Sequence, residues 1–153
     1  MAWYLLAALK EECKLNFDLG KFLELLAIAI MADMMELRDL NRVLVREGIK
    51  RINSSKRPAF RAIKQLYNKD KFSLDNISFL IAPLINSAGR MSDANVSFEF
   101  LYTRSFEKAF KLLEQIIAFN DKRKSEEKRL FEASLSQISA DDKVVLVSGK
   151  GWH

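Results

Sequence analysis

The side chains best suited to chemistry lie in residues 80–91, where the apolar sequence LIAPLI is followed at once by NSAGRM. Pro83 lacks an N–H group and clashes with the turn before it, so it disfavours a helix interior. The pattern therefore predicts a loop that presents the Asn86 amide, the Gly89 backbone N–H and the Arg90 guanidinium. A guanidinium matches phosphate bidentately, and glycine lets an anion approach the backbone closely. We predict a phosphate-binding loop, with a helix-ending glycine beside an exposed arginine as the structural alternative.

The charge of the chain favours polyanionic partners, because 25 Lys and Arg against 20 Asp and Glu give a net charge of +5. The basic residues form two clusters. The first comprises Lys56, Arg57, Arg61 and Lys64 around a predicted helix start, and it is either a phosphate-facing patch or ordinary helix surface. The second, residues 121–129, is interleaved with acidic residues and is typical of a solvated helical face.

The composition indicates a folded domain without a membrane span. A hydrophobic fraction of 49% with eleven Phe excludes an intrinsically disordered chain. No apolar run approaches the roughly twenty residues that cross a bilayer. The single cysteine, Cys13, cannot form an internal disulfide, and one histidine leaves no zinc constellation. These features, with a first segment that lacks the pattern of a signal peptide, predict a cytoplasmic protein.

The elements that must position these residues are almost all helices. Apolar periodicity predicts helices at residues 2–13, 21–32, 39–52, 58–67, 73–83, from 93 past 101, and 105–139. The first two are expected to be buried. The last is about thirty residues, roughly 45 Å long. Its apolar blocks on either side of residues 121–129 predict packing at both ends, as in a connector between two globular bodies.

Residues 143–147, KVVLV, have the composition of a buried strand. A buried strand needs a partner for its backbone, so we expect the chain to stop just inside a second domain. The aromatic residues at helical spacing are expected to belong to the core. They are Trp3, Phe22, Phe60, Phe79, Phe98 and Phe110.

Several separated segments resemble motifs of the RecJ family, the single-strand-specific exonucleases of the DHH phosphoesterase superfamily. Residues 31–48 resemble its "VADVVPL … NR-LV--GL" segment, and residues 81–91 resemble "-GPRINAAGRL". Residues 151–153 look like the start of "GWH-GV-G", and residues 120–126 resemble the "LN--R---E" portion of the helix that joins the two domains of the family. The Asn-x-Ala-Gly-Arg element is the most specific part of the resemblance.

The resemblance implies a mostly α chain cut from a larger α/β protein. Residues 1–104 would be the helical C-terminal part of the DHH catalytic domain, and residues 105–139 the long interdomain connecting helix. Residues 140–153 would begin the DHH-associated domain, a second α/β domain, with its first strand.

The resemblance also implies an activity and the residues that carry it. The parent would be a metal-dependent exonuclease that uses Mn²⁺ or Mg²⁺ to degrade single-stranded DNA from the 5′ end, in recombination and repair. Asp33 matches the acidic residue of the "VAD" motif and is implied to be a catalytic metal ligand. Arg90 would bind the substrate phosphate, with Asn86 and Gly89 shaping its loop. His153 would belong to the substrate-binding face of the second domain.

The chain also departs from the family. Leu84 stands where the family usually has Arg, and residues 34–36, MME, replace a Val-Val-Pro-like run. The other metal-binding aspartates and the Asp-His-His triplet lie upstream of the matched segments in the family. One carboxylate cannot hold two metal ions, so this polypeptide by itself is expected to be inactive.

Other functions remain open at this point. A non-catalytic single-stranded nucleic-acid-binding module and a helical protein-interaction module both fit the same residues. Within the superfamily, an oligoribonuclease or a nucleotide phosphodiesterase is the nearest alternative. Expected partners are single-stranded DNA and repair or recombination proteins, and exposed apolar surface is expected to promote self-association.

Overall fold

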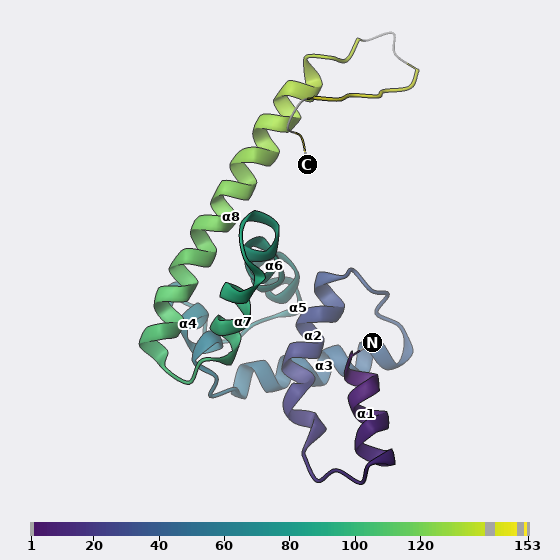
Figure 1. Cartoon of the computed structure of the whole chain (residues 1–153), viewed down its shortest axis with the longest axis vertical. Helices are drawn as coiled ribbons and strands as arrows, with labels where there is room; N and C mark the ends of the chain where they lie inside the picture. Colours follow the sequence, from purple (N-terminus) through teal and green to yellow (C-terminus); the bar gives the residue numbers. More distant parts are fainter. Residues whose placement is uncertain (1, 140–142, 150–151, 153) are drawn as a thin grey trace.

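The computed structural model describes residues 2–139, 143–149 and 152 (Figure 1). Within them every regular element is helical, which confirms the mostly α prediction. No helix in this part of the chain combines the length and apolarity needed to cross a bilayer. The elements in chain order are α1 (Ala2–Glu12), the 3₁₀ turn η1 (Leu19–Phe22), α2 (Leu23–Ala32), α3 (Asp39–Ser54), α4 (Pro58–Leu66), α5 (Leu74–Asn76), the π-helical segment η2 (Ile77–Ile81), α6 (Ala82–Met91), α7 (Ala94–Tyr102) and α8 (Phe106–Leu135).

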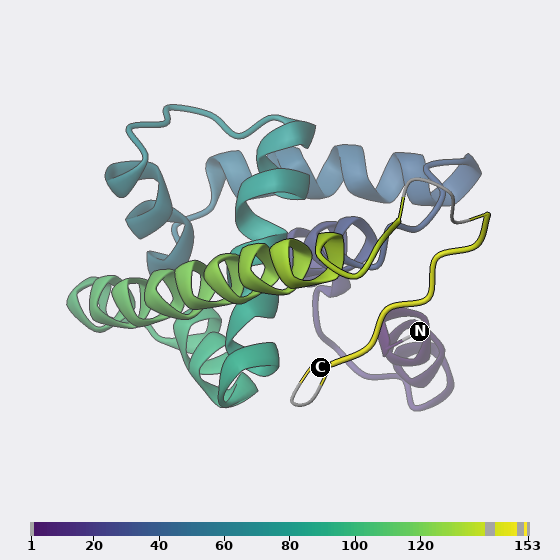
Figure 2. The same cartoon turned by 90° about the horizontal axis from the view of Figure 1, so that it is seen from above.

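The main core forms where α4, α6, α7 and the first half of α8 pack together, and α2 and α3 join it from one side. Viewed from above, α8 crosses over the helical stretch made by α5, η2 and α6 (Figure 2). A smaller cluster, Ile30, Leu44 and Val45, holds α2 against α3. The largest fully buried side chains of the main core include Phe60, Phe100, Ile52, Ile63, Ile77, Ile81, Leu113 and Ile116.

Four of the predicted helix starts are confirmed by the residues expected to begin them. The Ser73 hydroxyl accepts from the Asn76 N–H at 3.2 Å, and the Asn76 side chain accepts from the Ser73 N–H in return. Asp93 accepts from a backbone N–H at the start of α7, and Ser105 does the same for α8. Pro58 occupies the first turn of α4, where its missing N–H costs nothing.

Pro83 does not end the helix that contains it, so the predicted loop after residue 83 is wrong. The helical stretch continues from Leu74 to Met91. Just before the proline it widens into the π-helical η2, where the Ala82 N–H donates to the Ile77 carbonyl five residues back. A proline cannot donate to the preceding turn, and the π segment shifts the bonding by one residue so that the chain passes it.

The long helix α8 is packed at one end only. Its buried residues, Ala109, Leu113, Ile116 and Asn120, all belong to its first half. Beyond them the helix projects away from the body (Figure 1), and Phe131 is 64% exposed. The prediction of packing at both ends is confirmed for the first apolar block and wrong for the second, because no described segment covers it.

The expected strand at residues 143–147 is not formed in the part of the chain that the structure describes. Residues 143–149 have no regular structure, and Val144 and Leu146 are 85% and 94% exposed. The segment is held to the end of α8 by the Gln137 amide, which donates to the Ser148 carbonyl at 3.1 Å. No strand lies beside this segment in the described residues, so its backbone N–H and C=O groups have no sheet partner there.

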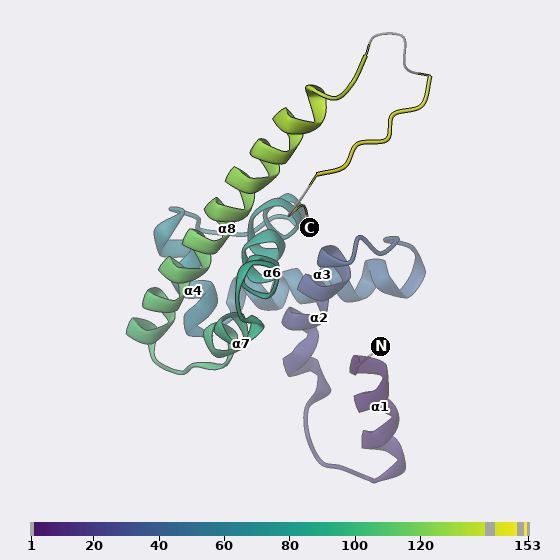
Figure 3. The same cartoon turned by 45° about the horizontal axis from the view of Figure 1, so that its top comes forward.

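The expected burial of α1 is wrong as well. Figure 3 shows α1 beside α2 and α3, on the side of the body away from α8. None of its residues is buried, and Leu5 is 62% exposed, although Trp3 packs on the smaller cluster. Among the aromatic residues expected in the core, Phe60 is buried but Phe79 and Phe98 are 82% and 61% exposed. The residue type shows that a side chain is apolar, but whether it is buried depends on which other parts of the chain pack over it.

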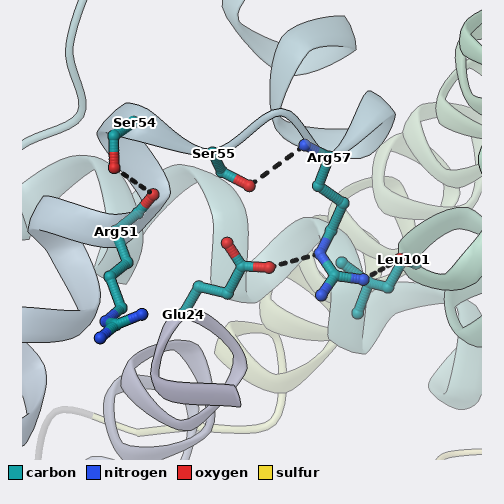
Figure 4. A network of polar contacts seen from close by, with 6 residues as sticks. All are labelled: Glu24, Arg51, Ser54, Ser55, Arg57 and Leu101. Atoms are coloured by element: carbon teal, nitrogen blue, oxygen red, sulfur yellow. Dashed lines mark hydrogen bonds and ion pairs between the residues drawn. The ribbon is translucent and has the colours of Figure 1, made fainter. Parts of the chain in front are cut away.

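A buried ion pair ties three elements together (Figure 4). The Nε of Arg57, just before α4, donates to Glu24 of α2 at 2.5 Å, and its Nη1 donates to the Leu101 carbonyl of α7 at 2.7 Å. The Arg57 N–H donates to the Ser55 hydroxyl at 3.2 Å. The side chains of Arg57 and Glu24 are only 25% and 10% exposed, so this pair is shielded from solvent.

Replacing Arg57 by lysine is expected to lower the free energy of unfolding by about 1–2 kcal/mol, because an ammonium cannot present the fork that reaches both acceptors. Urea denaturation followed by circular dichroism measures the change. Lys111→Gln is the matched control, since the Lys111–Glu107 pair at 2.9 Å lies on the exposed face of α8. Equal losses for both variants would show that the Arg57 fork contributes nothing beyond a surface pair.

Candidate phosphate-binding cleft

Asp33 lies at the C-terminal end of α2, at a tightly closed turn. Met34 follows with a positive φ of 50°, and the N–H groups of Met34 and Met35 donate back to the last turn of α2 at 3.3 and 3.1 Å. These two bonds form a Schellman ending. The turn leaves Asp33 exposed, and its carboxylate has no hydrogen-bond or ion-pair partner among the described residues. The side chain is therefore free to accept a cation.

A cleft of about 230 Å³ opens beside this turn, between the end of α2, η2, α6 and α8. Ala32 and Met34, the neighbours of Asp33, line it, whereas Asp33 itself lies next to the lining. We call it the arginine cleft. Its lining residues are Met31, Ala32, Met34, Ser78, Ala82, Pro83, Asn86, Arg90 and Arg123.

Asn86 and Arg90 reach the arginine cleft from α6 and not from a loop. They are four residues apart on the helix, so they lie on the same face. Beside them on α6 lies the fully buried Ser87, whose hydroxyl donates to the Leu84 carbonyl at 2.6 Å and lies 3.2 Å from the Ile116 carbonyl of α8. This anchor sets the orientation of Asn86 and Arg90.

Gly89 does not shape an anion-binding loop, which corrects the sequence-based prediction. It is a helical residue of α6, and a Cβ added to it would lie 3.4 Å from the Cβ of Ala94. Gly89 therefore lies where the start of α7 packs on α6, and it does not line the arginine cleft.

Arg123 is the cleft residue that the sequence analysis did not single out. It comes from the middle of α8, its side chain is 20% exposed, and its Nε and Nη2 donate to the Asn120 amide oxygen at 3.3 Å. Its Nη1 also bonds Glu127. The "LN--R" element of residues 120–126 contained the signal, because its arginine falls on this position.

The arginine cleft continues along α8 into a second hollow of about 720 Å³, which shares Arg90 and Arg123 with it. Lys128 and Arg129 pair with acidic residues of the same helix at 3.9 and 2.9 Å and are exposed, which confirms the solvated-face interpretation for these two. Arg90 and Lys122 have no ion-pair partner in the described residues and remain available to an anion.

Three cations of the first basic cluster make contacts within the protein. Arg57 pairs with Glu24, and Arg61 lies 5.3 Å over the Phe106 ring. Lys64 donates to the Asn53 carbonyl at 2.9 Å. These cations hold helices together, which leaves only Lys56 of the cluster without a described contact.

A divalent metal site is incomplete in the residues that the structure describes. No group of three or more His, Cys, Asp or Glu side chains lies close enough to hold an ion there. The free carboxylate of Asp33 suits one position around Mg²⁺ or Mn²⁺, which take oxygen ligands. Asp33 thus fits as a single ligand and not as a complete site. His153 lies outside the described residues, so its predicted role has no structural account.

Comparison with known proteins gives related sequences and structures, although no family model matches the chain. The chain is 31% identical over 137 residues to the single-stranded-DNA-specific exonuclease RecJ of Dickeya dadantii (strain 3937), covering 81% of this chain and 24% of that protein. It is 32% identical over 110 residues to RecJ of Escherichia coli (strain K12), covering 70% and 19%.

Solved structures resemble the fold as well. Crystal structures of RecJ from Thermus thermophilus in complex with Mg²⁺ and with Mn²⁺ superpose with TM-scores of 0.79 and 0.80 at 29% identity. They cover 92% and 91% of this chain and 22% and 21% of those chains. The chain therefore spans about a quarter or less of each of these relatives.

Proposed function

Because this chain is RecJ-like over most of its length, we propose that it supplies the phosphate-binding part of a single-stranded-DNA exonuclease. The observation that carries the proposal is the convergence of Arg90, Asn86 and Arg123 on one cleft beside Asp33. The rest of the parent protein would supply the other metal ligands and the second domain. Residues 1–104 would complete the helical side of the catalytic domain, and residues 105–139 would lead into the domain that starts at residue 140.

The arginine cleft has the chemistry to hold a nucleic-acid phosphate. Arg90 has no described partner for its guanidinium, and Arg123 is oriented by Asn120 and Glu127 before any ligand arrives. Guanidinium groups bind phosphate bidentately, and a preoriented group loses less entropy on binding. Asn86 adds an amide on the same face of α6. Two guanidiniums and an amide can thus grip one phosphate between α6 and α8.

Asp33 would hold one side of a divalent ion in the complete protein. The relatives were crystallised with Mg²⁺ and with Mn²⁺, and either ion, when bound, would activate a water for attack on phosphorus. The contribution of this chain is a carboxylate fixed at the end of α2, next to the residues that would fix the phosphate. We assign the activity to 5′-to-3′ degradation in recombination and repair, in the cytoplasm. Repair proteins and a second copy of the chain are the other proposed partners.

The second candidate is a non-catalytic single-stranded nucleic-acid-binding module. One specific observation favours it: the described residues contain no group of three or more His, Cys, Asp or Glu side chains that could hold a metal ion. The two candidates share the phosphate grip and differ only in whether the parent completes the metal site.

The proposed binding of phosphate by Arg90, Arg123 and Asn86, here called the phosphate grip, is tested by fluorescence anisotropy. A fluorescein-labelled oligothymidine is titrated with this chain across a salt series to measure its affinity. We expect Arg90→Ala to weaken binding by about 1–3 kcal/mol. The slope of the logarithm of affinity against the logarithm of salt concentration is expected to become shallower by about one, because one fewer phosphate is neutralised. Arg123→Gln is expected to weaken binding similarly.

Arg46→Ala is the control, because Arg46 is an exposed arginine of α3 outside both hollows and its loss changes the net charge equally. Binding that weakens no more for Arg90→Ala than for Arg46→Ala would reduce the interaction to non-specific charge and would remove the basis of the proposal.

A further inference from the structure

A separate groove of about 720 Å³ lies at the opposite end of α2 from Asp33. It is lined by residues from η1, the start of α2, the end of α3 and its connection to α4, and α7 with the two residues that follow it. The ten residues of α2 span about 15 Å, so this groove and the arginine cleft are distinct surfaces. We call it the aromatic groove, after Phe98 and Tyr102 in its wall.

The aromatic groove carries unpaired positive charge. Its cations are Lys21, Arg51, Arg57 and Arg104, and its one carboxylate is Glu24. Glu24 is neutralised by Arg57, and Figure 4 shows Arg51 close to this pair. The side chains of Lys21, Arg51 and Arg104 have no hydrogen-bond or ion-pair partner in the described part of the chain. The groove is therefore complementary to an anion.

The wall of the groove also presents two exposed aromatic rings. Phe98 and Tyr102 stack on each other with centroids 5.5 Å apart and planes 11° apart, yet they are 61% and 72% exposed. They lie four residues apart on α7, so the stack is fixed by the helix. Such rings offer their outer faces to a flat apolar group, and they stand beside cations spaced along the groove.

Exposed aromatic rings beside unpaired cations are the combination that binds single-stranded nucleic acid. A base must be unstacked to lie on a ring, which excludes a regular duplex. We propose that the aromatic groove binds a second stretch of single-stranded DNA, with bases stacked on Phe98 and Tyr102 and phosphates along Lys21, Arg51 and Arg104. The inference rests on the proposed function for the class of ligand only, because none of its residues lines the arginine cleft.

The test uses this chain and oligothymidines that carry 2-aminopurine, whose fluorescence reports base stacking. We expect the Phe98→Ala/Tyr102→Ala double variant to bind at least fivefold more weakly and to lose the fluorescence change on binding. Arg51→Gln is expected to weaken binding severalfold and to preserve part of that change. An abasic oligonucleotide of the same length is expected to bind the double variant and the unaltered chain alike.

Matched controls come from the same elements or residue types. Phe79→Ala removes an aromatic side chain that is 82% exposed and outside every described hollow, and Arg46→Gln removes another cation of α3. Thermal melting checks that each variant is folded, which we expect because Phe98 and Tyr102 are mostly exposed.

The outcomes separate this inference from the proposed function. Loss of affinity for Arg90→Ala alone would overturn the inference and keep the phosphate grip, whereas loss for the aromatic variant alone would do the reverse. A double variant that binds like Phe79→Ala overturns the inference. Tighter binding of a polyglutamate peptide than of oligothymidine would also overturn it, since the groove would then bind acidic protein.

Discussion

Replacing Asp33 by asparagine in the full-length protein is expected to lower nucleotide release from single-stranded DNA by about 100-fold or more. The expectation follows from the position of Asp33, an exposed carboxylate without a described partner at the rim of the arginine cleft. Loss of an outer-shell partner of a metal ligand typically costs 10–100-fold in activity, and loss of a ligand costs at least as much. Release of acid-soluble nucleotides with Mn²⁺ is the measurement.

A binding measurement distinguishes this role from a simple charge effect. Without metal, Asp33→Asn is expected to bind oligothymidine at least as tightly as the unaltered protein, because it removes a negative charge near Arg90. Asp70→Asn, an exposed carboxylate outside the arginine cleft, is the control and is expected to retain full activity. Unchanged turnover in Asp33→Asn would identify Asp33 as a plain helix-end carboxylate.

The sequence predicted the helices well where interactions between residues close in the chain determine where a helix begins. The caps at Ser73, Asp93 and Ser105 depend on side chains that bond their own backbone within three residues, so the printed sequence contains the whole interaction. Pro83 is the exception, because passing it as a helix requires the π-helical η2 and packing against α8 that no local rule contains.

Burial was predicted poorly wherever the covering surface comes from elsewhere. The segment at residues 143–147 and the end of α8 have the apolarity of buried elements, yet Leu146 and Phe131 are exposed in this chain. The apolar sequence of a segment shows that it could pack against another apolar surface, but it does not show whether such a surface lies beside it in this chain. Arg57 is the opposite case, a charged residue that is largely buried. Its sequence neighbours are basic, which suggested an exposed position, but Glu24 of α2 pairs with it inside the protein.

The sequence analysis named two residues that line the arginine cleft, but it placed them on a loop. Arg90 and Asn86 do reach one cleft, but they do so as neighbours on a helix face. A helix positions them more rigidly than a loop would, because the neighbouring buried Ser87 holds α6 against α8. The partner across the cleft, Arg123, lies more than thirty residues further along the chain, and only the fold brings it there.

Two helical glycines differ in whether another helix packs against them, so substituting each of them separates helix propensity from tertiary packing. Gly48 of α3 lies against α2, and a Cβ added to it would overlap the Ala27 methyl group and the Leu23 backbone carbonyl. Backbone cannot move aside cheaply, so Gly48→Ala is expected to force α2 and α3 apart. We expect it to lower the free energy of unfolding by about 3 kcal/mol in urea denaturation followed by circular dichroism.

Gly89→Ala is the matched helical glycine and is expected to behave oppositely. Its added Cβ would make an ordinary contact with Ala94, and alanine gains up to about 1 kcal/mol of helix propensity over glycine. We therefore expect unchanged or higher stability and unchanged oligothymidine binding, because Gly89 does not line the arginine cleft. Loss of binding without loss of stability in Gly89→Ala would mean that the anion approaches this backbone after all, as the sequence pattern first indicated.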